Sequence, residues 1–270
     1  MMTKVAVVTG ASSGIGAATA RRLAQAGFTV YGAARRVDRL AELERDGIRP
    51  LPLDLTDDEA MQAAVRKVLD EQGRIDVLVN NAGYGSYGAV EDVPLSEARR
   101  QFEVNVFALA RLAQLVIPTM RAQRSGRIIN VTSMGGKFAT AFGGWYHATK
   151  FAVEGLSDSM RQELAPFGVD VVIIEPGGIK TEWGGIAAES AQERSGDGPY
   201  ADRVAKIGSR LGSDSFGSDP SVVAKAIERA ATARRPRTRY AIGAGAKPLI
   251  AARKVLPDRA MDAMFARGLG

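Results

Sequence analysis

The sequence predicts an α/β fold, a doubly wound parallel sheet of about seven strands with helices on both faces. Short apolar runs rich in valine alternate with longer segments of helical periodicity, and a glycine-rich turn directly follows the first run. This alternation indicates βαβ units, whose strands run parallel. The chain has 270 residues and is 46% hydrophobic, enough to bury one large core. We therefore expect a single domain over residues 1–270.

The expected strands are short apolar runs without alternating polar positions. The first reads Lys-Val-Ala-Val-Val-Thr and ends at Gly10. Such runs are typical of strands that are buried on both faces of a parallel sheet. The expected strands cover residues 4–9, 28–34, 51–53, 76–80, 127–132, 169–175 and 239–243.

Three segments between the strands place apolar residues three and four positions apart, as in Phe102, Val106, Leu109 and Ala113. This spacing gives a helix an apolar stripe that faces the sheet. We expect helices over residues 57–72, 95–120 and 145–167. Residues 177–217 are rich in Gly, Ser and charged residues and show little periodicity. We expect them to form a mobile insertion over a binding site, a substrate lid.

Composition restricts the kind of site. The chain has no cysteine, so disulfides and thiolate metal sites are excluded, and the single His147 cannot build a histidine metal cluster. We expect no metal site. We also find no run of 18 or more apolar residues and no charged-then-apolar leader, so we expect a cytoplasmic protein.

The net charge of +6 comes from the C-terminal part of the chain. Residues 1–199 hold 22 Lys and Arg against 24 Asp and Glu, whereas residues 200–270 hold 14 against 6. The densest basic cluster, residues 234–239, is typical of a solvated helix end, so we do not expect a nucleic-acid partner. Residues 246–270 form a basic amphipathic tail. This tail packs on the domain, covers the substrate mouth or lies on an anionic membrane surface, and packing on the domain is favoured.

The turn after the first strand predicts a phosphate-binding loop. Its glycines are spaced G-x-x-x-G-x-G, and it leads directly into the first helix. Backbone N–H groups and the helix dipole attract phosphate there, and a side chain in place of glycine would hold the phosphate away. A plain tight turn is the alternative. The candidate cofactor-binding residues are Gly10, Ser12, Ser13, Gly14, Ile15 and Gly16.

Two arginines predict which dinucleotide binds. At the end of the second strand an NAD site would place an acid to bind the ribose 2′-hydroxyl, but this chain has Arg35 and Arg36. Two guanidinium groups there could bind a 2′-phosphate by bidentate hydrogen bonds. We therefore expect NADP(H) to be preferred over NAD(H).

Tyr146 and Lys150 form the candidate catalytic pair. On a helix, residues i and i+4 share a face, so the phenol and the ammonium would stand side by side. A free tyrosine is a poor acid or base near neutral pH, and a fixed cation nearby favours the phenolate. By itself such a pair arises often by chance. The neighbouring His147 should project to another side of the helix, and we do not expect it to be catalytic.

Together these motifs resemble the short-chain dehydrogenase/reductase family in order and spacing, over nearly residues 1–182. The motifs are Thr9–Gly16, Asn80-Asn81-Ala82-Gly83, Asn105, Ser133, Tyr146-x-x-x-Lys150 and Pro176-Gly177. Residues 30–36, 133–136 and 146–164 look like the hydroxysteroid- and retinol-dehydrogenase-like branch. The resemblance implies a Rossmann fold and an enzyme that interconverts a carbonyl and an alcohol by hydride transfer.

By this resemblance, Tyr146 is the acid that protonates the nascent alkoxide, and Ser133 donates a hydrogen bond to the carbonyl oxygen. Lys150 lowers the phenol pKa and binds the nicotinamide ribose, and Asn105 holds a water that relays protons to Lys150. The family pattern also implies a set of dinucleotide contacts beyond the glycine loop. They are Asp54, Leu55, Asn81, Ala82, Gly83, Asn105, Tyr146, Lys150, Pro176, Gly177, Ile179 and Thr181.

Aromatic and apolar residues predicted to lie in loops near the site suggest a hydrophobic substrate, although such residues could equally belong to the core. The resemblance implies a homodimer or homotetramer that pairs through helices 95–120 and 145–167. Two other functions stay open, a cofactor-binding sensor or scaffold without turnover, and an epimerase or dehydratase of the same superfamily. The apolar residues are Met134, Phe138, Phe142, Trp145, Trp183 and Ile186.

Overall fold

One parallel sheet organises the molecule, as the sequence predicts. The computed structural model describes residues 3–211 and 217–267. Among these, seven strands are ordered β3-β2-β1-β4-β5-β6-β7, all parallel. The order reverses between β1 and β4, which places a crevice at the carboxyl ends of these strands. The strands are β1 Val5–Thr9, β2 Thr29–Ala34, β3 Arg49–Pro52, β4 Val77–Asn80, β5 Gly126–Val131, β6 Val169–Pro176 and β7 Arg239–Ile242.

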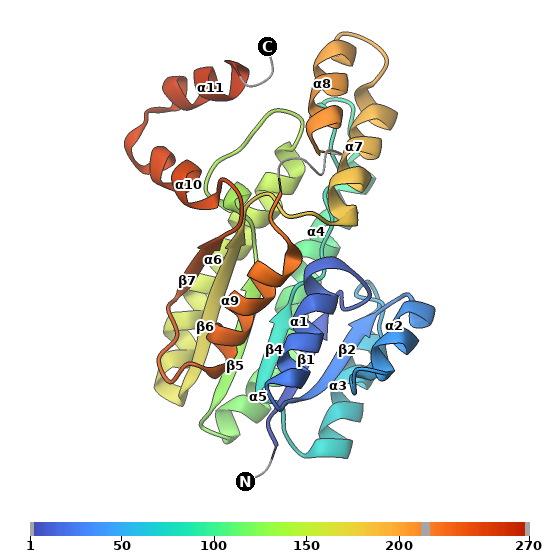
Figure 1. The fold of residues 1–270 in the computed structure, drawn as a ribbon, viewed down its shortest axis with the longest axis vertical. Helices are drawn as coiled ribbons and strands as arrows, with labels where there is room; N and C mark the ends of the chain where they lie inside the picture. The colour runs from blue at the N-terminus through green and yellow to red at the C-terminus, as the bar shows by residue number, and fades with distance from the viewer. Residues whose placement is uncertain (1–2, 212–216, 268–270) are drawn as a thin grey trace.

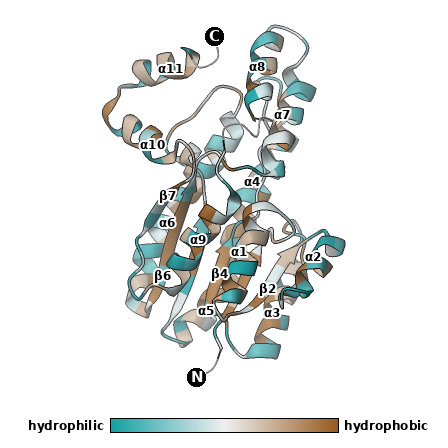
Figure 2. Cartoon of the chain, in the orientation of Figure 1, coloured by the Kyte–Doolittle hydropathy of each residue, from teal (hydrophilic) through white to brown (hydrophobic). Residues whose placement is uncertain are grey.

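Helices cover both faces of the sheet (Figure 1). On one face α1 Gly14–Gln25, α2 Val37–Glu44 and α9 Pro220–Thr232 bury an apolar cluster that includes Leu23, Leu40 and Ile227. On the other face α3 Asp58–Gln72, α5 Ala108–Ala122 and α6 Gly144–Leu164 bury a second cluster. Figure 2 shows the strands as hydrophobic ribbons between helices with hydrophilic outer faces, the pattern expected when both faces of a sheet are covered.

The segment predicted as one helix over residues 95–120 has three parts. These are α4 Leu95–Phe102, a π-helical turn Glu103–Phe107, and α5. The whole stretch Leu95–Ala122 is long and apolar enough, by length and composition, to cross a membrane. Its buried residues Ala108, Leu112 and Val116 pack in the core, so the sheet already occupies its apolar face.

Residues 177–217, expected to form a mobile insertion over a binding site, are largely helical in the part that the structure describes, despite their weak periodicity. This part forms α7 Glu182–Ser195 and α8 Ala201–Leu211, which pack against each other above the sheet (Figure 1). Residues 212–216 lie outside the described residues. Thr181 caps the N-terminus of α7, because its side chain accepts a hydrogen bond from the Trp183 N–H.

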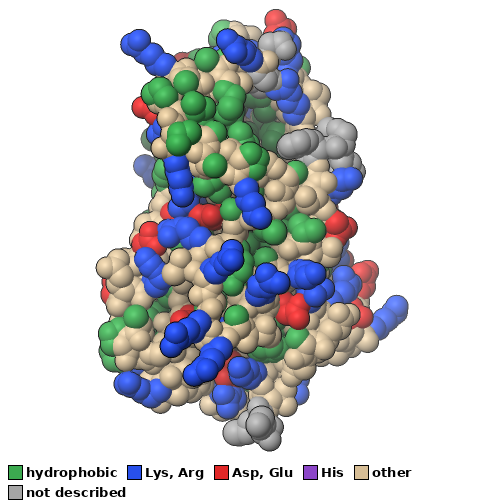
Figure 3. Space-filling model, turned by 60° about the vertical axis from the view of Figure 1, so that its left-hand side comes forward, with side chains coloured by type: hydrophobic (Ala, Val, Ile, Leu, Met, Phe, Trp, Pro, Cys, Tyr) green, Lys and Arg blue, Asp and Glu red, His purple; other side chains and the backbone are tan. Residues whose placement is uncertain are grey.

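The tail is helical as far as Arg267. Helices α10 Ala246–Val255 and α11 Asp258–Arg267 stand at the same end of the molecule as α7 and α8 (Figure 1), and residues 268–270 lie outside the described part. The ring of Phe265 stacks on Phe138 with centroids 5.2 Å apart. Figure 3 shows hydrophobic side chains gathered at this end, with Lys and Arg side chains around them and over the rest of the face in view.

Candidate active site

The glycine loop meets β4 through a threonine that the sequence analysis did not include among the site residues. The Thr9 side chain is buried, and its hydroxyl accepts hydrogen bonds from the N–H groups of Asn81 and Ala82, both at 3.0 Å. The Asn81 amide donates to the Thr9 carbonyl at 2.9 Å. These bonds hold the ends of β1 and β4 together. Asn81 and Ala82 therefore fix the start of the glycine loop through Thr9.

Glycine is required in the loop because the backbone passes very close to its neighbours. Gly10 has φ +68° and Gly14 has φ +50°, a region that side chains disfavour. A Cβ on Gly16 would lie 2.1 Å from the Gly10 carbonyl oxygen, and one on Gly14 would lie 2.9 Å from Thr181 Cγ2. The backbone of the loop is thus open at the start of α1, where N–H groups point outward. This cradle fits a pyrophosphate.

Arg36 lies across the glycine loop. Its guanidinium donates to the Ser12 hydroxyl at 3.2 Å and to the Ser13 hydroxyl at 2.9 Å. The three side chains stand beside a cleft of about 620 Å³ at the start of α1, which Ser12 and Ser13 line together with Arg39. A set of two hydroxyls and guanidinium groups at such a cleft suits a phosphate group.

Three further expected cofactor-binding residues, Arg35, Asp54 and Leu55, lie at the carboxyl ends of β2 and β3. Arg35 is exposed, and its charge helps lower the pKa of Asp54. The larger cause is hydrogen bonding, because Asp54 accepts from the Thr56 N–H at 2.9 Å and from the Thr56 hydroxyl at 2.8 Å. Asp54 is therefore a fixed carboxylate, and Leu55 beside it packs partly against the core.

Tyr146, Ser133 and Lys150 converge, as the motif spacing predicts. The Ser133 hydroxyl lies near enough to the Tyr146 phenol to lower its pKa. Lys150 Nζ lies 5.8 Å from the centre of the Tyr146 ring and donates to the Val131 carbonyl at 3.1 Å. Helix α6 supplies the pair, and the end of β5 supplies Ser133. A carbonyl oxygen at this point would meet two hydroxyl donors.

Burial dominates the titration of this pair. Both side chains are 7% exposed. Burial raises the pKa of Tyr146 to about 12, against a lowering by the Ser133 hydroxyl. Burial also lowers the pKa of Lys150 to about 8, and the nearby Glu154 carboxylate opposes that shift. Burial therefore favours the protonated phenol at Tyr146, and the expected lowering of its pKa by Lys150 stays a prediction.

Asn105 sits in the π-helical turn that interrupts the long helix. Its side chain donates to the Tyr84 carbonyl at 2.9 Å and to the Thr149 hydroxyl at 3.1 Å, and it accepts from the Tyr84 N–H at 3.1 Å. A Cβ on Gly83 would lie 3.0 Å from Asn105 Oδ1 and 3.7 Å from Lys150 Nζ. Asn105, Gly83 and Lys150 thus border one small space. A π turn inside a helix often marks a functional site.

His147 is a structural residue of the Ser133 loop. Its ring nitrogens lie 2.9 Å from the Gly135 carbonyl and 3.0 Å from the Thr140 hydroxyl. Burial lowers its pKa. Both ring nitrogens are engaged away from Tyr146, so this geometry supports the expectation that His147 is not catalytic. The Ser133 hydroxyl also accepts from the Gly135 N–H at 3.0 Å.

The start of α7 covers the phenol. The rings of Trp183 and Tyr146 have centroids 5.0 Å apart, and Tyr87 lies 5.8 Å from both. Phe142 belongs to the same apolar cluster as Tyr146. Of the other apolar residues expected around the site, Phe138 is buried against the tail, and Ile186 is exposed. The wall over Tyr146 is therefore mainly aromatic.

The loop from β6 to α7 crosses the opening above the glycine loop. Pro176 ends β6, and Gly177 packs against the Ala244 carbonyl, where a Cβ would come within 2.1 Å. Ile179 packs against the core cluster beneath α1, as Ile15 does. Thr181 faces Gly14. This loop, which carries four of the expected dinucleotide contacts, thus lies beside the cradle, and its Thr181 side chain faces Gly14.

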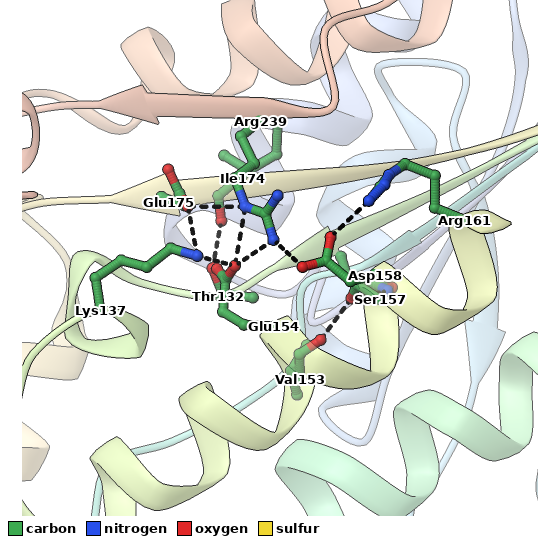
Figure 4. A network of polar contacts seen from close by, with 11 residues as sticks. Thr132, Lys137, Val153, Glu154, Ser157, Asp158, Arg161, Ile174, Glu175 and Arg239 are labelled. Atoms are coloured by element: carbon green, nitrogen blue, oxygen red, sulfur yellow. Dashed lines mark hydrogen bonds and ion pairs between the residues drawn. The ribbon is translucent and has the colours of Figure 1, made fainter.

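A buried charge cluster lies behind the site (Figure 4). It consists of Lys137, Glu154, Asp158, Glu175 and Arg239. Glu154 pairs with both Lys137 and Arg239, and Glu175 lies 3.4 Å from each of these two cations. Glu154 also accepts from the Thr132 hydroxyl at 2.7 Å. Burial raises the pKa of Glu175, and the Glu154 charge adds to that shift.

The sequence and the fold are similar to those of known proteins. The family model described as short chain dehydrogenase matches residues 4–191. The chain belongs to the short-chain dehydrogenase/reductase family. A relative from Bacteroides thetaiotaomicron, named 3-ketodihydrosphingosine reductase, is 36% identical over 97% of this chain and 96% of its own.

Two further similarities cover almost the whole length. A relative from Ornithobacterium rhinotracheale, named NADPH-dependent 3-dehydrocapnine reductase, is 35% identical over 98% of this chain and 97% of its own. The crystal structure of a short-chain dehydrogenase from Streptomyces avermitilis is 35% identical, with a TM-score of 0.84, and covers 99% of this chain and 96% of that one. The protein is thus an oxidoreductase of this family, and its Rossmann-type fold is confirmed.

Sequence reasoning missed residues whose importance depends on tertiary contacts. Thr9 is the first residue of the Thr9–Gly16 motif, but the motif did not indicate a role for its side chain. Arg39 and Glu182 are ordinary surface residues in the sequence, yet they bond to each other at 2.5 Å beside the glycine loop. Tyr87 follows β4 in a loop without a motif. The only signal for Arg39 was its position one turn after Arg36.

Proposed function

We propose that this protein is an NADP(H)-dependent carbonyl reductase, reversible as an alcohol dehydrogenase, that acts on a hydrophobic substrate. The observation that carries the proposal is the convergence of the Tyr146 phenol, the Ser133 hydroxyl and the Lys150 ammonium beneath an aromatic wall. Family membership supports hydride-transfer chemistry.

The cofactor is the hydride donor when it is bound. The glycine loop would hold its pyrophosphate, and Arg36 with Ser12 and Ser13 would hold a 2′-phosphate. Lys150, Asn105 and Gly83 border the space for the nicotinamide ribose, and Thr181 lies near the far side. The NADPH dependence named for one relative supports this choice.

Ser133 and Tyr146 would both act on the carbonyl oxygen of the substrate. The Ser133 hydroxyl donates a hydrogen bond to it, and Tyr146 gives up its phenolic proton as negative charge develops there. Because burial raises the pKa of Tyr146 to about 12, the phenol carries its proton throughout the neutral range, as an acid in the reductive direction must. Lys150 is a cation near the ring, and it stabilises the phenolate that remains.

The chemistry of the covering residues supports an apolar substrate. Tyr87, Phe142 and Trp183 border Tyr146, and two relatives are named as reductases of 3-keto or 3-dehydro compounds. A ketone with an apolar body would fit both observations.

The C-terminal tail would pack on the domain near the site, which the stacking of Phe138 and Phe265 supports.

The proposal also covers how the subunits assemble and where in the cell the protein is located. Phe107 on the π turn and Phe151 on α6 are 54% and 46% exposed, which supports pairing of two subunits through these helices. We propose a homodimer or homotetramer. Location in the cytoplasm stays a prediction from composition.

The test is NADPH oxidation with a panel of hydrophobic ketones, in the wild type and in Tyr146→Phe. Loss of the phenolic proton should lower kcat by at least a hundredfold, the usual scale of general-acid catalysis, while NADPH still binds. Tyr240→Phe is the matched control, because it removes the same hydroxyl from a tyrosine on β7 that is bonded to the Arg237 N–H and not to a site residue. NADPH binding without turnover of any ketone would instead favour the sensor or scaffold.

A further inference from the structure

Glu182, the first residue of α7, reaches across the cofactor cleft to two arginines. One carboxylate oxygen lies 2.5 Å from Arg39 Nη1, and the other lies 3.2 Å from Arg36 Nη1. Glu182 is 143 and 146 residues away from these partners in the chain. The contact therefore depends on how the α7–α8 pair sits over the sheet.

The two arginines have the surroundings of a phosphate site. Arg36 also donates to the hydroxyls of Ser12 and Ser13, and Arg39 lines the cleft of about 620 Å³ at the start of α1. Two guanidinium groups and two hydroxyls around one point can each donate to an oxyanion. In the unliganded protein the oxyanion at that point is the Glu182 carboxylate.

The next residue links this contact to the phenol. Trp183 packs on Tyr146 and Tyr87, and its N–H donates to the Thr181 hydroxyl at 3.3 Å. The first turn of α7 thus contacts the arginines through Glu182 and Tyr146 through Trp183. A turn of helix moves largely as a unit, since its backbone bonds tie successive residues together. A displacement that moves the Glu182 backbone therefore shifts Trp183.

We propose that Glu182 is a specificity-determining residue whose carboxylate occupies the 2′-phosphate subsite between Arg36 and Arg39 until a 2′-phosphate displaces it. A ribose 2′-phosphate carries more negative charge than a carboxylate and offers three acceptor oxygens. A dinucleotide with a bare 2′-hydroxyl has no group that can compete for the arginines. It leaves Glu182 in place and Trp183 over Tyr146.

This inference rests on the proposed use of NADP(H) and adds two consequences to it. Selectivity for the 2′-phosphate comes from the lid as well as from the arginines. Exposure of Tyr146 to substrate is coupled to the arrival of the phosphorylated cofactor, so cofactor binds before ketone.

The experiment compares 2′,5′-ADP with ADP as probes, because both contain the adenosine and only one contains the 2′-phosphate. Calorimetry gives the dissociation constants for the wild type, Glu182→Gln and Glu42→Gln. Glu42 is a matched control, since it lines the same cleft beside Arg39. Glu182→Gln should bind 2′,5′-ADP about threefold to tenfold more tightly, because two exposed ion pairs no longer compete. ADP binding should change less than about twofold. Glu42 acts on Arg39 by its charge but is not bonded to it, so Glu42→Gln should strengthen 2′,5′-ADP binding by clearly less than Glu182→Gln does.

Tryptophan emission tests the coupling to the phenol. The chain has two tryptophans. Addition of 2′,5′-ADP to the wild type should shift the emission, ADP should not, and Trp183→Phe should abolish the shift. An emission that does not respond in the wild type contradicts the coupling.

The outcomes separate this inference from the proposed function. If the wild type binds 2′,5′-ADP no better than ADP, the assignment of NADP(H) fails and this inference fails with it. If the wild type prefers 2′,5′-ADP but Glu182→Gln leaves its affinity unchanged, or Glu42→Gln raises it equally, Glu182 does not occupy the subsite and NADP(H) stands. Far-UV circular dichroism of each variant excludes misfolding as the cause.

Discussion

The charge on Lys150 gives the active site a pH limit that can be measured. Burial lowers the pKa of Lys150 to about 8, so the side chain is about nine-tenths charged near pH 7 and about one-tenth charged near pH 9. If the charged form is required, kcat/KM for NADPH should be constant on the acid side and fall about tenfold per pH unit above pH 8. The ratio kcat/KM reports groups of the unliganded enzyme, which is the state in which this pKa applies.

Glu154→Gln should move this limit toward lower pH. The Glu154 carboxylate raises the pKa of Lys150 against the effect of burial. Neighbours at i and i+4 on a helix interact across about 6–8 Å, or about 2–3 kcal/mol at an effective dielectric constant of 20. Lys137 and Arg239 pair directly with Glu154 and cancel half or more of that. About 1 kcal/mol remains, which should lower activity about threefold near pH 8 and about fivefold well above it, where Lys150 is mostly neutral in both enzymes.

The assay is NADPH oxidation from about pH 6 to pH 10, with Glu163→Gln as the control. Glu163 lies on the same helix but is exposed. Near pH 6 the Glu154→Gln enzyme should approach wild-type activity, because Lys150 is charged in both. A variant profile that coincides with the wild-type profile would refute the electrostatic reasoning. An equal loss at every pH would show that Glu154 acts only by holding the structure.

Three further predictions concern the cofactor cradle. Thr9→Val should lower the free energy of unfolding in urea by about 2 kcal/mol, because the half-buried Ala82 N–H loses its acceptor; Thr9→Ser, which keeps the hydroxyl, should lose less than half of that. Arg36→Ala should weaken NADPH binding in calorimetry by about tenfold or more, and Arg35→Ala by less, because only Arg36 bonds to the serines of the loop; equal effects would contradict the geometry. Gly16→Ala should abolish NADPH binding, since its Cβ would lie 2.1 Å from the Gly10 carbonyl oxygen; wild-type affinity in a folded variant would show that the loop can relax.

The strands were predictable because each is an apolar run buried on both faces. All seven expected strands exist, with ends that differ by at most two residues, such as β3 at Arg49–Pro52 against the expected 51–53. Helix α7 was missed because Gly184, Gly185 and several alanines give it no apolar stripe. Helix α8 could have been found, since Val204, Ile207 and Leu211 recur at helical spacing.

Some features of the candidate site were also predictable from the sequence, and others were not. Tyr146 and Lys150 were predictable as neighbours because helix geometry fixes residues i and i+4 on one face. The pKa of the phenol was not, because it depends on how completely α7 and the Ser133 loop exclude water. Trp183 over Tyr146 and Glu182 on Arg36 are contacts between remote segments. Local sequence patterns contain no information about such distances.

The charge cluster in Figure 4 explains how separate segments keep one geometry. Lys137 follows the Ser133 loop, Glu154 lies one turn beyond Lys150 on α6, and Glu175 directly precedes Pro176 on β6. The segments that carry Ser133, the Tyr146–Lys150 pair and Pro176 therefore each contribute at least one charge to the same cluster, in which Glu154 and Glu175 are buried. A buried ion pair adds little net stability, because desolvation offsets the attraction, but separating its charges in a poorly solvated interior is costly. A shift of any one segment would separate such charges, so the cluster holds Ser133, the Tyr146–Lys150 pair and the loop to Thr181 in register with one another.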